Sequence, residues 1–332
     1  TEAARADLLA SEEGRRSAIL TLVSAVANSY LTLRSTDKQL EISRATADAY
    51  LETLRLFELR YKGGVINEMQ LAQVRSQYQQ ALARIPLFEQ QVARLENALS
   101  VLLGRNPGPI PRGKAIDELV QAAVPAGLPS TLLERRPDIL AAEQNLVAAN
   151  ARIGAARALY YPSISLTGFL GSTSTEFSDL FSGATKTWSS AGSLVGPIFD
   201  AGAIEGTVAQ AEAQQRRLLS TYEQTVQNAF REVDDALVDY RKSGESLAAQ
   251  ARDVEALKTY ARLANLRFDA GYSDYLEVLD AQRSLFTSQL NFTQSQALQF
   301  QSLVNIYKAL GGGWVTEADK LTVAKPNLAA GK

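Results

Sequence analysis

The segment Leu59-Arg60-Tyr61-Lys62-Gly63-Gly64 returns 207 residues later as Leu266-Arg267-Phe268-Asp269-Ala270-Gly271. The same displacement, without a gap, aligns further residues of the same kind: Val26 with Val233, Arg34 with Arg241, Asn67 with Asp274, Met69 with Leu276, and Leu103-Gly104 with Leu310-Gly311. A register that is kept over this length indicates an internal repeat. The chain is therefore expected to contain two copies of one structural unit.

Both copies carry apolar residues at the spacing of three and four that is typical of helices. The first copy has three such runs: Ile19, Leu22, Val23, Val26, Tyr30 and Leu33; Tyr50, Leu54, Phe57 and Tyr61; Leu71, Val74, Tyr78, Leu82, Ile85, Phe88, Val92, Leu95, Leu99 and Leu102. They predict helical structure before Gly63-Gly64 and a helix over 68–103 that continues through a kink at Pro86. The second copy predicts helices over 203–268 and 275–310. Two long helical hairpins follow from the pattern.

From Tyr160 the helical period gives way to an alternation with a period of two, which predicts strands. Ile164 and Leu166 alternate with serine and threonine, and a second segment, roughly 187–199, has Trp188, Leu194 and Ile198 on one face. The two segments predict a β-hairpin with a loop over 172–183. Apolar residues outward, small polar residues inward and aromatic residues near the ends are typical of a transmembrane β-barrel. An ordinary half-buried hairpin is the alternative.

Five of the ten prolines lie between the copies, in residues 105–130. Because proline ends helices, this segment is predicted to be a connector. The predicted division is a first-repeat helical hairpin over 1–104, the connector over 105–130, the second repeat over 131–313 and a C-terminal tail over 314–332. Residues 130–207 have no counterpart in the first copy, so the first repeat is expected to lack its beginning.

The composition excludes most enzyme chemistry. Among 332 residues there is no cysteine and no histidine, so thiol nucleophiles, imidazole bases and the usual zinc ligands are absent. We expect no enzyme, no cofactor and no metal site. The 34 basic and 36 acidic residues give a net charge of −2, which does not favour nucleic acid as a partner. The chain starts at Thr1 and its only methionine is Met69, so its start is expected to be processed or truncated.

Six sequence words, in order along the chain, resemble the TolC-like outer membrane factors, in particular the branch that serves resistance-nodulation-division efflux pumps. They are Leu132-Leu133-Glu134-Arg135-Arg136-Pro137-Asp138-Ile139, Ala148-Ala149-Asn150-Ala151-Arg152-Ile153-Gly154-Ala155-Ala156-Arg157, Tyr161-Pro162-Ser163-Ile164-Ser165-Leu166, Gly196-Pro197-Ile198-Phe199-Asp200-Ala201-Gly202, Leu279-Asp280-Ala281-Gln282-Arg283 and Tyr307-Lys308-Ala309-Leu310-Gly311-Gly312-Gly313-Trp314. The resemblance covers nearly the whole chain.

The resemblance implies a mainly α fold with a β-hairpin, in which long paired helices form a trimeric α-barrel and the strands join a shared transmembrane β-barrel. It implies a homotrimer in contact with outer-membrane lipid, reaching into the periplasm, as the passive exit channel of a tripartite, multidrug-type efflux pump. The expected partners are a periplasmic adaptor (membrane fusion) protein and an inner-membrane resistance-nodulation-division transporter. Residues before Thr1 are expected to hold the other strand hairpin and, in many relatives, a lipid-modified cysteine, which would make the full-length protein a lipoprotein. A soluble helical adaptor or a coiled-coil spacer is the alternative that periodicity alone leaves open.

Two sets of site residues follow from the repeat and the resemblance. The helix breaks predict periplasmic tips that contact the adaptor, formed by Gly63, Gly64, Asn67, Gly271, Tyr272 and Ser273. Glu277 and Asp280 stand three apart after the second tip, and the resemblance implies that acids at these positions constrict the periplasmic aperture. Their first-repeat equivalents are Gln70 and Gln73. Plain turns and a solvated helix face are the alternatives.

Two further features are expected to be structural. Glu134, Arg135 and Arg136 precede Pro137 and are expected to cap and pair at a helix start, with Ser130 as the N-cap. Trp314 follows three glycines and is expected to be a packing anchor beside the equatorial region.

Overall fold

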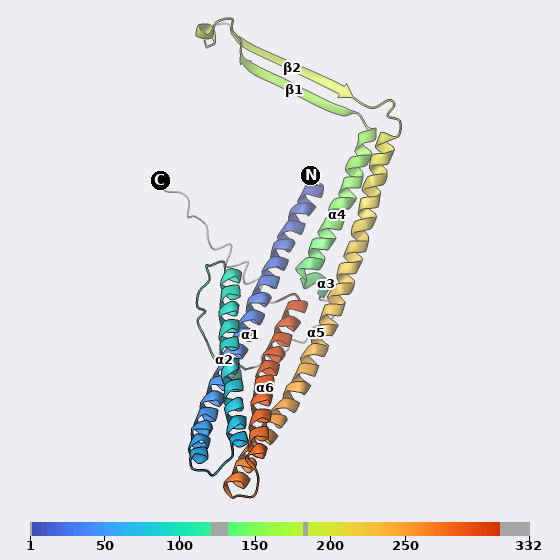
Figure 1. The fold of residues 1–332 in the computed structure, drawn as a ribbon. Helices are drawn as coiled ribbons and strands as arrows, with labels where there is room; N and C mark the ends of the chain where they lie inside the picture. The colour runs from blue at the N-terminus through green and yellow to red at the C-terminus, as the bar shows by residue number, and fades with distance from the viewer. Residues whose placement is uncertain (1, 121–131, 182–184, 313–332) are drawn as a thin grey trace. The chain divides into compact units, whose positions relative to one another are not determined.

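The computed structural model of the chain describes residues 2–120, 132–181 and 185–312 (Figure 1). Its elements follow the order α1 (Glu2–Lys62), α2 (Glu68–Leu102), η1 (Ile116–Glu118), α3 (Leu132–Arg135), α4 (Pro137–Arg157), η3 (Ala158–Tyr160), β1 (Ser163–Ser172), η4 (Phe177–Asp179), β2 (Lys186–Val195), α5 (Ala203–Asp269) and α6 (Tyr275–Ala309). Predictions for Ser130, for Trp314 and for the tail over 314–332 lie outside the described residues. Among the helices of the described ranges, none has a segment long and apolar enough to cross a membrane.

The helix boundaries confirm the repeat. Helices α1 and α5 end at Lys62 and Asp269, which are 207 residues apart. Helices α2 and α6 each contain 35 residues, and both of their ends differ by the same 207 positions. The sequence repeat is therefore a repeat of a helix, a turn and a second helix.

The helices predicted from the apolar stripes are confirmed, and the stripe residues differ in their burial. Phe57, Val74 and Leu99 are fully buried, and α2 continues through Pro86 as predicted, while a kink there stays a prediction. Leu22 and Val23, which were expected in the stripe, are 45% and 39% exposed. Further along α1, Ser35 and Thr36 are buried, and hydrogen bonds join α1 to α6 in this region. Ser35 Oγ donates to the Thr293 carbonyl (3.1 Å), and Gln301 Nε2 donates to Thr32 Oγ1 (2.8 Å).

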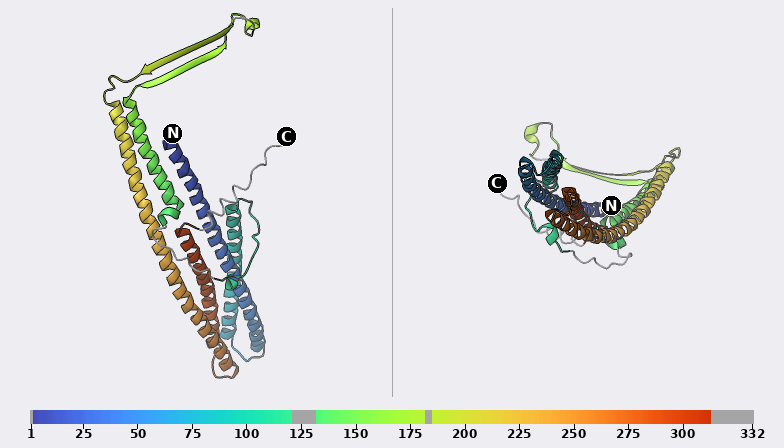
Figure 2. Two further views of the ribbon diagram at one scale, coloured as in Figure 1. Left: turned by 180° about the vertical axis from the view of Figure 1, so that it is seen from behind. Right: turned by 60° about the horizontal axis from the view of Figure 1, so that its bottom comes forward.

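The chain forms two compact units. One comprises the residues up to Gly14 together with Asp138–Val226, and the other comprises Arg15–Pro137 and the residues from Gln227 onward, within the described ranges. In the second unit, α6 lies alongside α5, where Ile306 and Ala309 of α6 pack against Ala236 (Figures 1 and 2). The units do not follow the boundaries of the sequence repeats, and the division at 104, 130 and 313 stays a prediction.

The strand hairpin belongs to the first unit. Strands β1 and β2 pair antiparallel, from Ser163 opposite Val195 to Ser172 opposite Lys186. The predicted hairpin is thus confirmed, but Ile198 is not a strand residue because β2 ends at Val195. Proline has no N–H to donate to a strand ladder, so Pro197 prevents its continuation. Ile198 lies fully exposed in the segment that leads to α5.

Candidate functional site

The two tips have the same turn. In the first, the Val65 N–H donates to the Arg60 carbonyl (2.9 Å), and Gly64 has a φ of 73°. In the second, the Tyr272 N–H donates to the Arg267 carbonyl (2.8 Å), and Gly271 has a φ of 77°. This is the Schellman arrangement, which closes a helix end on a left-handed residue and favours glycine there. The predicted turns at Gly63-Gly64 and Gly271-Tyr272 are confirmed.

Both tips display apolar side chains at equivalent positions. Val65 and Met69 of the first tip are 75% and 64% exposed, and their equivalents Tyr272 and Leu276 are 80% and 56% exposed. An exposed apolar set of this kind is typical of a surface that binds a partner. Of the predicted tip residues, Asn67 is not available for such a contact through its side chain, because it caps α2.

The helices after the turns start differently. Asn67 Oδ1 accepts a hydrogen bond from the Gln70 N–H (3.0 Å), and Gln70 Oε1 accepts one from the Asn67 N–H (3.2 Å). This reciprocal capping box occupies the Gln70 side chain. In α6, Asp274 Oδ1 accepts from the Tyr275 N–H, and Glu277 takes no part in the cap. The equivalent of Gln70 is therefore an acid that remains available for other contacts.

Of the four predicted aperture residues, the structure brings Gln73 and Asp280 to one groove, whereas Glu277 lies beside Arg267 and Gln70 caps α2. Glu277 Oε1 lies 3.6 Å from Arg267 Nε, and Asp280 Oδ1 lies 2.8 Å from a terminal guanidinium nitrogen of Arg283. Gln73 and Asp280 line one groove of about 210 Å³ between α2 and α6. The Glu277 and Asp280 side chains are 30% and 49% exposed, so both carboxylates reach solvent.

An aromatic cluster beneath the tips joins the two repeats, and sequence analysis did not find it. The Tyr275 ring centroid lies 4.2 Å from that of Phe57 and 5.0 Å from that of Phe268. The Arg60 guanidinium lies over both phenylalanine rings, 5.7 Å and 5.5 Å from their centroids. Burial raises the pKa of Tyr275 to about 12, so the hydroxyl stays neutral. The cluster fixes the end of α1 against α5 and α6.

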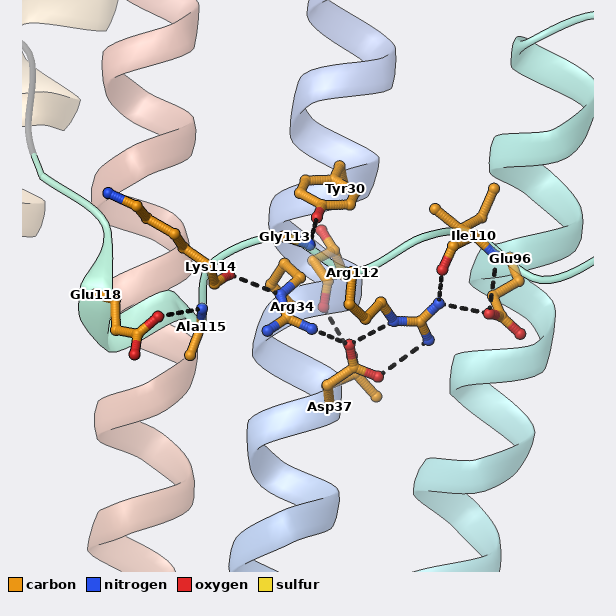
Figure 3. Close-up of polar contacts among 12 residues, drawn as sticks. Tyr30, Arg34, Asp37, Glu96, Ile110, Arg112, Gly113, Lys114, Ala115 and Glu118 are labelled. Atoms are coloured by element: carbon orange, nitrogen blue, oxygen red, sulfur yellow. Dashed lines mark hydrogen bonds and ion pairs between the residues drawn. The ribbon is translucent and has the colours of Figure 1, made fainter.

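The described part of the predicted connector forms a strap, residues 105–119, across α1 and α2 (Figure 3). Arg112 bridges the two helices: its Nε donates to Asp37 Oδ2 of α1 (2.9 Å), and its guanidinium also donates to Glu96 of α2. The Gly113 N–H donates to the Tyr30 hydroxyl (2.8 Å). The strap therefore ties α1 to α2 at a point far along both helices from the tips.

Charge and packing both hold the strap in place. The hydrogen bonds that Arg112 donates to Asp37 and to Glu96 raise the pKa of Arg112, and the bond accepted from Arg112 lowers the pKa of Glu96. Ile110 is buried against Leu33 and Leu99, between the helices that Arg112 bridges. The conspicuous prolines marked the connector in the sequence, but nothing in the pattern identified these partners.

Arg136 has the structural role that was expected of it. Its side chain is 7% exposed and pairs with Glu232 of α5 at 2.8 Å. It also donates to the Ala309 carbonyl at the end of α6 (3.2 Å). A cation at a helix C-terminus interacts favourably with the helix dipole. Arg136, which directly precedes α4, thus joins Glu232 in the middle of α5 to the C-terminal end of α6, and all three residues belong to the second unit.

The hairpin has one apolar face and one face of mostly small polar residues. The register pairs Ile164 with Leu194 and Leu170 with Trp188, so most of the large apolar residues of both strands share a face. Leu166 on the same face is 87% exposed. The opposite face carries Ser165 beside Ser193, whose hydroxyls lie 3.5 Å apart. Exposed strands with two such different faces meet the requirement for separating lipid from water.

Comparison with known proteins identifies the class to which these features belong. The outer membrane efflux protein family matches residues 1–105 and 128–312. The chain belongs to this family, and the predicted family resemblance is confirmed.

Two curated relatives and one solved structure illustrate the similarity. The solvent efflux pump outer membrane protein SrpC of Pseudomonas putida is 42% identical over 307 residues, which are 92% of this chain and 65% of SrpC. The cation efflux system protein CusC of Escherichia coli is 37% identical over 95% of this chain and 68% of its own. The open-state crystal structure of the MtrE outer membrane channel of Neisseria gonorrhoeae has a TM-score of 0.84 and 33% identity, over 94% of this chain and 71% of that chain. The chain thus spans about two thirds of the length of these relatives.

Proposed function

We propose that the complete protein is the outer-membrane channel component of a tripartite efflux pump and that it conducts small molecules passively to the exterior. The observation that carries the proposal is the exposed hairpin, whose register sorts apolar and small polar residues onto opposite faces. Three copies, with further strands supplied by residues beyond this chain, would close a membrane barrel with its polar face inward. Family membership supports the same role. A conducting passage requires no catalytic step.

The long paired helices support an extension into the periplasm. Helix α5 has 67 residues, which correspond to about 100 Å at 1.5 Å per residue. A soluble helical adaptor or spacer is the alternative, but an exposed apolar sheet face is a liability in water. The relatives are named for solvents in one case and for cations in another, so the class of substrate varies within this family. A resistance-nodulation-division transporter is the proposed source of the substrate.

The tips are the proposed contact surface for a periplasmic adaptor. Val65, Met69, Tyr272 and Leu276 would supply the apolar part of the contact, and Gly63, Gly64 and Gly271 allow the close turns behind it. Single cysteines replacing Asn67 or Ser273 in the full-length protein are expected to crosslink to a cysteine at an adaptor tip in intact cells. Arg231→Cys is the control because Arg231 is exposed on α5 and far from the tip. Crosslinks at position 231 and none at the tips would remove the proposal.

The acids after the second tip are proposed to line the periplasmic aperture. Threefold symmetry would bring six carboxylates of Glu277 and Asp280 together, and such a ring favours cations. In single-channel recordings of the full-length trimer, Glu277→Gln with Asp280→Asn is expected to lower the preference for cations severalfold. Glu255→Gln is the control, since Glu255 pairs with Lys258 three positions on, as Asp280 does with Arg283. If selectivity and conductance match the parent in the double variant, the acids lie away from the aperture.

A further inference from the structure

One aromatic residue stands on the small polar face of the hairpin. Odd-numbered residues of β1 and β2 share this face, and in the two strands, which the structure describes completely, Phe169 is the aromatic residue among them. It lies opposite Ser189 and is 56% exposed. It is three residues from the loop end of β1. A large ring in a row of serine and threonine is not explained by burial.

The ring of Phe169 lies down along its own strand, over Gly171. A Cβ atom added at Gly171 would be 2.7 Å from Phe169 Cζ and 3.2 Å from Cε1. Residues two apart in a strand point to the same face, so the ring fills the space that a side chain at position 171 would take.

We propose that Gly171 sets the width of the passage near the loop end of the barrel, by letting the Phe169 ring lie flat. The proposal rests on the proposed function, which turns the small polar face of the hairpin toward the passage. Any side chain at position 171 displaces the far end of a rotatable ring and leaves the backbone unchanged. The displaced ring turns away from the strand surface into the passage, and threefold symmetry repeats the obstruction three times.

Gly168 offers a matched control on the opposite face. A Cβ added at Gly168 meets no atom within 4 Å, and this residue pairs with Ser190 on the apolar face. Gly168→Ala therefore carries the same change in backbone freedom as Gly171→Ala without displacing a ring. Gly168 lies in the middle of β1 and Gly171 near its end, both within the strand. The intrinsic effect of alanine on strand stability is therefore expected to be comparable at the two positions.

The width is measured on the full-length trimer in planar lipid bilayers, with polyethylene glycols of graded size added on the loop side. Gly171→Ala is expected to exclude the largest polymer that the parent admits. Phe169→Ala and the double variant Phe169→Ala with Gly171→Ala are expected to admit it, and Gly168→Ala is expected to match the parent. Equal cut-offs for all four variants would overturn the inference while the protein still conducts.

A second measurement reports on the ring without relying on conduction. The aromatic ring current is expected to shift the Gly171 Hα resonances upfield in the parent, and the shift is expected to vanish in Phe169→Ala. Absence of this shift in the parent overturns the inference and leaves the channel function standing. If the trimer shows the shift but forms no channel in any bilayer, both the proposed channel function and the inference about the width of the passage are wrong.

Discussion

Phe57→Ala is expected to lower the local free energy of unfolding at the tips by about 3–5 kcal/mol, the usual range for truncating a buried phenylalanine. Phe57 is 1% exposed and packs with Leu54, Leu71, Val74 and Tyr275 in one core. Its ring also lies under the Arg60 guanidinium. The cavity would form where α1, α2, α5 and α6 meet, so no single helix can move to fill it.

Hydrogen exchange of the full-length trimer measures this effect, because local opening is reported residue by residue. Amides near the ends of α1 and α5 are expected to exchange much faster in the variant. Leu59→Ala is the control: Leu59 is two residues away on α1 but 67% exposed, and its change is expected to stay within about 0.5 kcal/mol. Equal exchange in the two variants would show that the aromatic cluster does not hold the tips together.

The repeat, the helix ends and the tip turns could be predicted because their causes are local. Gly64 and Gly271 adopt positive φ, which glycine tolerates best, and the apolar pattern restarts directly after each turn. A displacement of 207 therefore located the ends of four helices. The hairpin was equally visible, because its alternation of residues is a local property of each strand.

Other features depend on partners that are distant in the sequence, and no local pattern revealed them. Phe57 and Phe268 come from different repeats, and Arg112 joins Asp37 to Glu96. The inward position of Ser35 reflects its bond to the Thr293 carbonyl, 258 residues away. At the candidate aperture, the sequence placed Gln70 beside the acids, whereas the structure uses its side chain to cap α2.

The strap and the aromatic cluster hold the first helical hairpin at two different places. The cluster holds α1 near Lys62, while Arg112 and Ile110 hold α1 and α2 together near Asp37 and Glu96. The pairing of α1 with α2 therefore does not depend on Val65 and Met69, the exposed side chains of the proposed contact surface. The proposed contact surface at the tip and the strap thus lie at different places along α1 and α2.

The Arg136→Met variant is expected to be destabilised by about 2–4 kcal/mol, near the range of about 3–5 kcal/mol for removing one partner of a buried ion pair. The Arg136 side chain is 7% exposed, and its loss leaves the Ala309 carbonyl without this donor and Glu232 without this cation. Glu232 is 43% exposed and can be hydrated, which lowers the expected effect. Methionine keeps much of the packing volume, so the change tests the charge and its hydrogen bonds.

Arg152→Met is the matched control for Arg136→Met. Arg152 pairs with Asp7 at 2.6 Å, a closer contact than that of Arg136, but the two side chains are 50% and 42% exposed. Exposed pairs contribute less than about 1 kcal/mol, because water screens both charges. Thermal unfolding of the full-length trimer in detergent is expected to start at a clearly lower temperature for Arg136→Met than for Arg152→Met. Equal shifts would mean that burial does not decide the strength of these pairs, and Arg136 would then be an ordinary surface cation and not a link between the middle of α5 and the end of α6.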